Sequence, residues 1–474
     1  MTALIIHGHF YQPPRENPWT GEIEPEPSAA PYHDWNERIH AECYAPNVNN
    51  YPQISFNFGP TLLSWLASKH PDTYQKILDA DKASSAVRGG HGNAIAQAYG
   101  HAILPLCNER DRLTQVLWGL ADFRFRFGRE AESLWLPETA ANDHVLALLI
   151  EQGLRYVILA PNQAKGAIDS SRPYRFLHPD GSGRSLAVFF YNGPLARAIA
   201  FERALASSRG LVDLFIRAAQ DGDLVNVATD GETYGHHFKF GDLCLAHALE
   251  VEAKEAGFWI TNYAEYLDRH PPELEVEIDD GPDGEGTSWS CAHGVGRWSR
   301  DCGCHTGGEA GWDQKWRQPL RAAFDFLRDD VAEKFQDVGA ELLADPWAAR
   351  NQYIGVILDP EHVREEFLKR HAVRSLSTSE EARVWNLLEM QRSALSMFTS
   401  CGWFFADVAG IETIQVIRYA ARVVDLLNRL GLEPPLRKFL EIMAEAKSNR
   451  VEKGNGADLF LATDERGLLT DESR

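Results

Sequence analysis

The sequence predicts an α/β protein in which a barrel-like sheet of seven strand–helix units precedes an all-helical C-terminal domain. Seven short, almost continuously apolar segments recur up to residue 229, as expected of strands that are buried on both faces. Amphipathic segments lie between most of them, and alternating strands and helices indicate a parallel sheet. Seven such units over about 250 residues favour a barrel over an open sheet. From about Pro319, apolar residues recur at the three- and four-residue spacing of helices.

The N-terminal segment supplies the first predicted strand. Residues 1–7 contain no basic stretch and only a short apolar run, so we expect a strand there rather than a signal peptide. In chain order, the predicted strands are Leu4–His9, Gln53–Phe58, Ser85–Arg88, Ser133–Pro137, Arg155–Ala160, Ser185–Tyr191 and Leu224–Thr229. The predicted helices among them and after the last are Asn108–Phe127, Asn142–Gln152, Ser208–Gln220 and Asp242–Ala256.

Composition divides the chain into four segments. The catalytic barrel is predicted over residues 1–270, and a Gly/Cys/Trp-rich lid or insertion over residues 271–318. Long loops in compact domains are usually functional or disordered, and the tryptophans of this loop argue against disorder. A helical domain is predicted over residues 319–448, and a polar tail that we expect to fray over residues 449–474. The predicted helices of this domain are Leu320–Phe335, Asp345–Leu358, Pro360–His371, Ser379–Met397 and Ile411–Leu430.

Length and charge disfavour several classes of function. At 474 residues the chain is too long for one ordinary core, and the formal net charge of −21 argues against binding to nucleic acid or to an anionic membrane surface. No apolar run approaches the roughly 20 residues of a membrane helix. The seven cysteines are an odd number and mostly scattered, which fits reduced thiols and a cytoplasmic protein. No feature of the sequence indicates the oligomeric state.

Two predicted strands end on a carboxylate. The segment 132–140 reads as a buried strand that ends at Glu138, close to Trp135, and the segment 224–232 ends in the same way at Asp230. Retaining glycosidases use such a pair as nucleophile and acid/base, with the carboxyl groups about 5–5.5 Å apart. Burial and a negative neighbour can keep the acid protonated near neutral pH. We therefore predict that Asp230 has a raised pKa and that the two carboxyl groups lie within about 7 Å.

Other polar side chains gather at the predicted strand ends. His7 and His9 share one face of the first strand, where they could bind a metal, bind sugar hydroxyls or pair with backbone groups. Further candidates for substrate binding are His91 in a Gly-Gly-His-Gly loop, and Glu232, Tyr234 and His236, which closely follow Asp230. The structural alternatives are a tight turn around His91 and a solvated loop after Asp230.

Together these stretches resemble glycoside hydrolase family 57. The family's motifs are matched by His7-x-His9 with Tyr11-Gln-Pro-Pro14, by His101 with Leu104-Pro105, by Trp135-x-x-Glu138, and by Asp230-Gly-Glu-Thr-Tyr-Gly-His236. The resemblance implies a distorted (β/α)7 barrel followed by a helical domain. It also implies a retaining mechanism on α-glucans without a metal or other cofactor, with Glu138 as the nucleophile and Asp230 as the general acid/base.

The resemblance extends to substrate contacts. It implies that His7, His9, His101 and Trp135 line the sugar subsite. A further family motif in the helical domain usually holds an Asp-Trp pair. Trp403, in the segment Cys401–Asp407, is the nearest match and departs from that pattern.

The segment 287–305 lies outside the general family pattern and resembles a less characterised branch of the family. It contains Cys291, His293, Cys302, Cys304 and His305, residue types that bind Zn²⁺. The Cys-x-Cys spacing is less usual in zinc sites than Cys-x-x-Cys. We favour a Trp- and Gly-rich lid over the sugar site with packed thiols, and a zinc site is the alternative.

The sequence therefore predicts a retaining enzyme that acts on an oligo- or polysaccharide, most simply an α-glucan. Amylase, 4-α-glucanotransferase and branching enzyme types fit equally. A metal-dependent deacetylase or mannosidase-like barrel enzyme is the enzymatic alternative, but it leaves Trp135-x-x-Glu138 unexplained. A non-catalytic glycan-binding protein is a third reading, and the presence of both acids counts against it.

Overall fold

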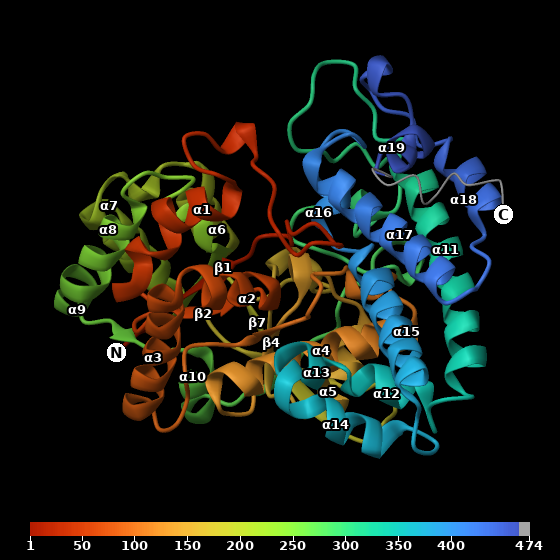
Figure 1. Cartoon of the computed structure of the whole chain (residues 1–474). Helices are drawn as coiled ribbons and strands as arrows, with labels where there is room; N and C mark the ends of the chain where they lie inside the picture. Colours follow the sequence, from red (N-terminus) through yellow and green to blue (C-terminus); the bar gives the residue numbers. More distant parts are fainter. Residues whose placement is uncertain (464–474) are drawn as a thin grey trace. The chain divides into compact units, whose positions relative to one another are not determined.

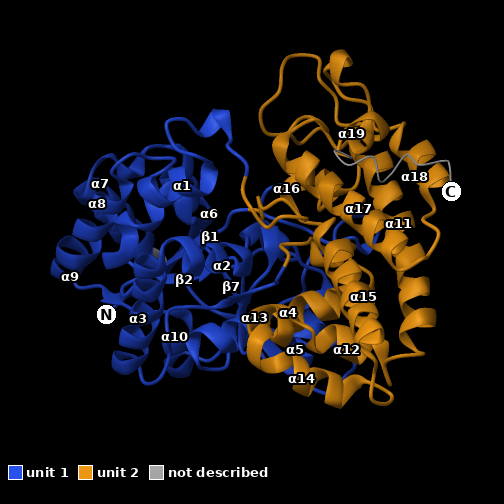
Figure 2. Ribbon diagram, viewed as in Figure 1, with its two compact units in different colours: residues 1–12, 24–99, 122–290 blue, residues 13–23, 100–121, 291–474 orange. Residues whose placement is uncertain are grey.

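The structure, a computed structural model, describes residues 1–463 and has a mixed α/β architecture with a helical C-terminal region (Figure 1). Its Cα positions divide into two compact units, and neither is continuous in the sequence (Figure 2). Unit 1 comprises Met1–Gln12, Glu24–Tyr99 and Asp122–Ser290. Unit 2 comprises Pro13–Ile23, Gly100–Ala121 and the described chain from Cys291 onward. The predicted lid is thus divided between the units after Ser290.

Seven parallel strands form a closed ring in unit 1. They are β1 (Ala3–Phe10), β2 (Ser55–Phe58), β3 (Ala96–Gln97), β4 (Leu134–Trp135), β5 (Tyr156–Leu159), β7 (Ser185–Phe190) and β8 (Leu224–Asp230). Parallel ladders pair β1 with both β2 and β8, β3 with β4, and β5 with β7. The ring is completed by parallel bridges Phe56–Ala94 and Ser133–Tyr156, and by a 2.8 Å bond from Asn192 N–H to the Asn226 carbonyl. The predicted barrel is confirmed.

Three further strands and a set of helices complete unit 1. β6 (Tyr174–Leu177) runs antiparallel to β7, β10 (Leu274–Glu275) pairs with β6, and β9 (Trp259–Ile260) pairs with β1. The helices are α1 (Trp35–Ile39), α2 (Pro60–Lys69), α3 (Pro71–Val87), α5 (Asp143–Glu151), α6 (Gly193–Phe201), α7 (Ser208–Ala218), α8 (Gly241–His247), α9 (Ala253–Glu255) and α10 (Tyr263–Arg269). α4 (Glu109–Phe127) begins in unit 2 and ends in unit 1.

The prediction of a third strand at Ser85–Arg88 is wrong. Residues 85–87 end α3, whose buried residues Ile77, Ala80, Asp81 and Ser84 follow helical spacing. The third strand is β3, and its two residues are too few to show a strand pattern in the sequence.

Unit 2 is built mainly from helices. Those that begin at residues 317, 346, 354, 360, 378 and 411 are predicted from the sequence to within a few residues, and those that begin at residues 401, 436 and 456 are not. In chain order, these helices are α11 (Arg317–Gly339), α12 (Pro346–Gln352), α13 (Ile354–Leu358), α14 (Pro360–His371), α15 (Thr378–Ser396), α16 (Cys401–Phe404), α17 (Ile411–Arg429), α18 (Leu436–Met443) and α19 (Gly456–Ala462). The single helix predicted over Asp345–Leu358 is divided at Tyr353 into α12 and α13.

The predicted fraying of the tail is wrong for residues 449–463. These residues contain α19, and the buried ring of Phe460 packs edge-on against Phe439, with ring centroids 5.0 Å apart. The remainder of the predicted tail, residues 464–474, lies outside the described residues.

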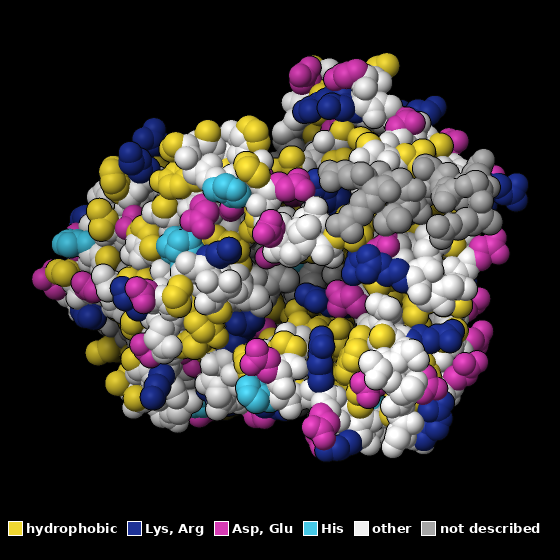
Figure 3. Space-filling model, viewed as in Figure 1, with side chains coloured by type: hydrophobic (Ala, Val, Ile, Leu, Met, Phe, Trp, Pro, Cys, Tyr) yellow, Lys and Arg dark blue, Asp and Glu magenta, His cyan; other side chains and the backbone are white. Residues whose placement is uncertain are grey.

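Charged side chains of both signs are interspersed on the face drawn in Figure 3, where neither sign gathers into one large patch. Among residues 1–463, no helix combines the length and the apolar character needed to cross a membrane.

Candidate active site

A row of polar side chains lines one level of the barrel in unit 1. Strand register pairs Asp230 with His9 and His9 with Asn57. Gln97 pairs in the same way with Trp135, and the Asn57 amide donates to Gln97 Oε1 at 2.7 Å. Residues paired across adjacent parallel strands project from the same face. This row lies at the carboxyl ends of the strands, where barrel enzymes hold their active sites.

His7 and His9 are buried and uncharged. The ring nitrogens of His7 lie 2.9 Å from Ser55 Oγ and 3.0 Å from Asn57 Oδ1. Burial lowers the pKa of His7 and of His9 to about 3, so both are neutral at physiological pH. The Trp135 ring stacks on both imidazoles, with centroids 4.7 and 4.9 Å apart. Because Trp135 is itself only 1% exposed, it orients the histidines rather than offering an open face to a sugar.

The two histidines do not belong to a converging set of metal ligands. Among residues 1–463, ligand atoms of His, Cys, Asp and Glu come within 4.8 Å of one another in two groups. The groups are Glu37, His40 and His70, and Cys291, His293, Cys302 and Cys304. Neither includes His7, His9 or Asp230, so these residues do not assemble the triad that a metal-dependent deacetylase would require.

Glu138 projects from a left-handed turn just after β4. The backbone φ angles of Glu138 and Thr139 are 59° and 50°, in a region that non-glycine residues rarely adopt. The turn is closed by bonds from Thr139 N–H to the Leu136 carbonyl at 2.8 Å and from Ala140 N–H to the Pro137 carbonyl at 2.9 Å. Such conformations persist where surrounding contacts enforce them, and they concentrate at functional sites.

Residues 287–290 hold both the backbone and the side chain of Glu138. Ala141 and Thr287 form an antiparallel bridge, and Trp289 N–H donates to the Glu138 carbonyl at 3.1 Å. Ser290 Oγ and Trp289 Nε1 donate to Glu138 Oε2 at 2.7 and 3.1 Å. Two donors on one carboxylate oxygen fix the direction in which this acid points.

Gln163 joins the Glu138 turn to residue 287 from inside the protein. It is fully buried, and its Oε1 accepts from Thr139 Oγ1 at 2.8 Å and from Ala160 N–H at 2.9 Å. Its amide group donates to the carbonyls of Thr139 at 2.8 Å and Thr287 at 3.1 Å. One side chain therefore satisfies polar groups from three segments.

We expect Gln163→Leu to lower the free energy of unfolding by about 2–4 kcal/mol, because leucine leaves several buried polar groups unpaired. Urea unfolding of the purified variant measures this loss. Gln75→Leu on the exposed face of α3 is the matched control. If the two variants differed by less than about 0.5 kcal/mol, the bracing role of Gln163 would be refuted.

Asp230 lies at the solvent-exposed end of β8, but protein atoms surround its carboxyl group and disfavour its charged form. This burial together with the charge of Glu138 raises the pKa of Asp230 to about 7. The predicted rise and both of its causes are confirmed. The predicted separation of the two carboxyl groups stays a prediction.

The residue after Asp230 must be small. A Cβ at Gly231 would lie 2.3 Å from ring atoms of Phe10, which fills the space beside the chain. The glycine thus lets the strand end close against β1.

Two further groups interact with Asp230. Glu232 is buried, and its Oε1 accepts from Tyr44 Oη at 2.7 Å and from Tyr11 N–H at 3.1 Å. Burial and, as a smaller effect, the charge of Asp230 raise the pKa of Glu232 to about 8. Burial and the same charge raise the pKa of Tyr191, just after β7. Interacting acids titrate as a group, so this cluster retains protons near neutral pH.

His91 does not join the row of polar side chains, which corrects its predicted place in the sugar site. Its ring nitrogens contact Glu132 at 3.0 Å and Asp268 at 2.8 Å. Glu132 precedes β4, whereas Glu138 follows it, so His91 belongs to the opposite end of the strand. Its two acidic partners raise the pKa of His91 against the effect of burial.

Tyr234 and His236 are held by other parts of unit 1. Tyr234 is fully buried, and its hydroxyl oxygen accepts from Thr229 Oγ1 at 3.1 Å. The ring of His236 pairs with Glu42 and lies edge-on to Trp35. The structure thus gives Tyr234 no surface for substrate, which corrects that prediction.

His101 and Trp403 belong to unit 2. His101 adopts a φ of 52°, and its Nδ1 lies 2.7 Å from Ser400 Oγ. Trp403 is 1% exposed, and its ring lies edge-on to Phe324. The predicted contact between Trp403 and substrate is therefore corrected, because a buried ring has no free face.

Sequence reasoning misses three residues of the site. Ser290 and Gln163 contact the Glu138 turn from distant segments, and neither stands in a recognisable motif. Tyr191 offers a weak signal, because it is an aromatic residue directly after an apolar strand.

Comparison with known proteins supplies independent findings. Residues 26–279, just over half of the chain, match the family described as Glycosyl hydrolase family 57. Residues 312–466 match a domain of unknown function, DUF3536. Among curated proteins, an α-amylase of Pyrococcus abyssi is 23% identical over 266 residues, which are 54% of this chain and 39% of the relative. A 4-α-glucanotransferase of Thermococcus litoralis is 22% identical with the same coverage. The chain thus spans well under half the length of these curated relatives.

Solved structures resemble the chain over nearly its whole length. An exo-type maltose-forming amylase of Pyrococcus sp. ST04 has a TM-score of 0.69 at 15% identity, covering 97% of this chain and 82% of that one. A GH57-type branching enzyme of Pyrococcus horikoshii has a TM-score of 0.60 at 16% identity, covering 99% and 95%. These likenesses show the fold, and the family match over residues 26–279 shows the membership. The chain belongs to glycosyl hydrolase family 57.

Proposed function

We propose that this chain is a retaining enzyme that hydrolyses or transfers α-glucans, with Glu138 as the nucleophile and Asp230 as the general acid/base. The observation that carries the proposal is the carboxylate of Glu138, held in a left-handed turn at the end of β4, whose charge, together with burial, raises the pKa of Asp230 to about 7. One carboxyl thus holds its proton near neutral pH. Its neighbour is fixed by Trp289 and Ser290, which donate to a single oxygen. This division into one acid and one nucleophile is what the retaining mechanism requires.

The reaction has two steps. In the first, Asp230 donates its proton to the glycosidic oxygen while a Glu138 oxygen bonds to the anomeric carbon, which releases one sugar chain and leaves a glycosyl ester. In the second, the Asp230 carboxylate takes a proton from water or a sugar hydroxyl, whose oxygen displaces Glu138. Forming the ester removes the charge of Glu138, so the pKa of Asp230 falls when this residue must act as a base.

The neighbouring side chains suit a neutral sugar. Trp289 is half-buried and lies edge-on to the buried ring of Tyr191, with centroids 6.3 Å apart, and the exposed part of Trp289 provides aromatic surface against which C–H faces pack. Burial holds His9 neutral, so its imidazole adds no charge beside the two acids. The named relatives, an α-amylase, a 4-α-glucanotransferase and a branching enzyme, support an α-glucan as the substrate.

Product analysis tests the proposal. The protein is incubated with maltoheptaose and with amylose while chain lengths and reducing ends are followed. Redistributed chain lengths at constant reducing ends indicate transfer, rising reducing ends indicate hydrolysis, and new branch points indicate branching. No turnover of either glucan would contradict the proposed substrate.

Ser290 is a positioning residue in this account, because it acts through Glu138. Ser290→Ala removes a 2.7 Å hydrogen bond to the carboxylate, and we expect kcat/KM to fall roughly 10- to 100-fold. Ser290→Thr keeps the hydroxyl and should restore most of the activity. An alanine variant as active as the wild type would exclude this role.

A further inference from the structure

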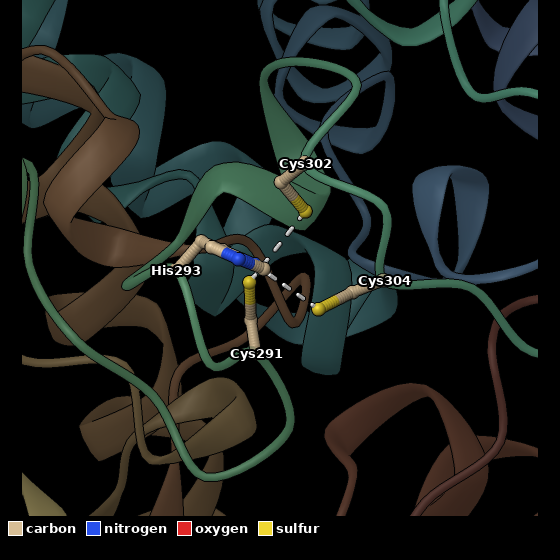
Figure 4. A group of neighbouring side chains, drawn as sticks. All are labelled: Cys291, His293, Cys302 and Cys304. Atoms are coloured by element: carbon tan, nitrogen blue, oxygen red, sulfur yellow. Dashed lines mark hydrogen bonds between the residues drawn. The ribbon is translucent and has the colours of Figure 1, made fainter.

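Four metal-binding side chains converge in unit 2, outside the proposed active site. Cys291, His293, Cys302 and Cys304 point toward one another in Figure 4, and their ligand atoms all lie within 4.8 Å of one another. They come from two short segments, Cys291-Ala-His293 and Cys302-Gly-Cys304, which the chain brings together across the turn at 296–298. We propose that these residues form a structural zinc site, the alternative that the sequence left open.

The distances agree with tetrahedral coordination. With Zn–S bonds of about 2.3 Å and Zn–N bonds of about 2.05 Å, tetrahedral geometry places two sulfurs about 3.8 Å apart and a sulfur and a nitrogen about 3.6 Å apart. The sulfurs of Cys291 and Cys302 are 3.8 Å apart, and Cys304 Sγ lies 3.5 Å from His293 Nδ1. Both measured pairs therefore span the edges of a zinc tetrahedron.

The ligand set selects zinc and a structural role. Three thiolates and one imidazole are a common zinc donor set, and tetrahedral sulfur-rich sites favour zinc over magnesium or calcium. Four protein ligands leave no open position for a reacting water, which distinguishes structural from catalytic zinc. His305 completes no fifth position, because its exposed ring bonds to the Gly307 carbonyl at 2.8 Å.

Surrounding contacts hold the two ligand segments. Fully buried Arg317, at the start of α11, donates to the Cys304 carbonyl at 2.7 Å and to the Phe405 carbonyl at 3.3 Å. Arg297 lies over the Phe404 ring at 4.2 Å and donates to Thr306 Oγ1 at 3.3 Å. A Cβ at Gly296 would lie 3.1 Å from Cys302 Cβ, so the turn approaches the ligand closely. Contacts of this kind orient metal ligands.

A disulfide is the competing explanation for two of the cysteines. A disulfide needs sulfurs about 2.05 Å apart, whereas those of Cys291 and Cys302 are 3.8 Å apart. A Cys291–Cys302 disulfide would also not explain why Cys304 Sγ lies 3.5 Å from His293 Nδ1. A metal accounts for all four side chains together.

The test measures zinc in the reduced, full-length protein, purified without a metal-affinity tag. Elemental analysis should find about one zinc ion per chain, and Co²⁺ exchanged into the site should give the visible d–d absorption of tetrahedral cobalt. Cys302→Ser and His293→Ala should lower the zinc content at least fivefold. His293 is exposed, so its replacement by alanine removes a ligand without leaving a cavity in a packed core. Cys107→Ser, a half-buried cysteine of the same unit, should keep the zinc.

The outcomes separate the explanations without an activity assay, so they are independent of the proposed glucan chemistry. Zinc lost with the ligand variants and kept by Cys107→Ser supports the site. Wild-type protein that contains no zinc and takes up neither Zn²⁺ nor Co²⁺ when reduced would overturn it. A Cys291–Cys302 disulfide in protein isolated under reducing conditions, detected by peptide mass spectrometry, would also overturn it.

Discussion

Replacing Glu138 by glutamine is expected to lower kcat/KM on maltoheptaose by roughly 10⁴-fold or more, because the amide cannot form the glycosyl ester. The variant should fold, since the replacement has the same shape and its amide oxygen can still accept from Ser290 and Trp289. Rates of maltoheptaose turnover measure the loss. Glu130→Gln is the matched control, because Glu130 is exposed and pairs only with Arg124 among the ion pairs of the described chain.

A chemical rescue identifies the role of Glu138 more directly than the loss of rate. In Glu138→Ala, azide should occupy the vacated space and attack the anomeric carbon of an activated α-glucoside. A single displacement inverts the centre, so the expected product is the β-glucosyl azide. Formation of the α-azide would instead assign the acid/base role to Glu138 and reverse the proposed pair.

Replacing Asp230 by asparagine is expected to lower kcat/KM on maltoheptaose by about 10²–10⁴-fold, the usual contribution of general acid–base catalysis. The loss should be much smaller on a substrate with a good leaving group, such as a dinitrophenyl α-glycoside, because that leaving group needs no proton in the first step.

The pH dependence follows from the raised pKa of Asp230. The general acid must be protonated, so wild-type kcat/KM should be high below about pH 7 and fall about tenfold per pH unit above it, where Asp230 ionises. Asp230→Asn should lose this alkaline fall. Profiles of kcat/KM from pH 5 to 9 for both proteins check the expectation, and an alkaline fall that persists in the variant would assign it to another group.

Most of the fold can be predicted from the sequence because buried helices and strands have recognisable patterns of apolar residues. Strands such as β1 and β8 are buried on both faces and read as continuous apolar runs. The prediction of the third strand fails for a physical reason. β3 has only two residues, and it is recognised by its pairing with β4 rather than by its composition. The mostly polar composition of the tail predicts fraying, yet α19 forms there and buries the ring of Phe460 against Phe439.

Only those residues of the candidate site that lie at the end of a strand can be predicted from the sequence. Glu138 and Asp230 stand out because each follows an apolar run in the chain itself. Ser290 contacts Glu138 from 152 positions away, through a bridge that only the folded chain creates. His91 and Trp403 are residue types that often bind sugars, so the sequence suggests a role that the structure does not support. His91 is held by acidic side chains such as Glu132, and Trp403 is enclosed in the helical core beside Phe324.

Trapping of the glycosyl intermediate tests the central claim most directly. A 5-fluoro-α-glucosyl fluoride forms the ester readily but releases it slowly, because the fluorine at C5 destabilises the oxocarbenium-like state of both steps while the fluoride at C1 leaves easily. After incubation and proteolysis, mass spectrometry should find one glycosylated peptide, with the sugar ester on Glu138. Turnover without any trapped ester, or an ester on a different residue, would contradict the retaining mechanism with Glu138 as its nucleophile.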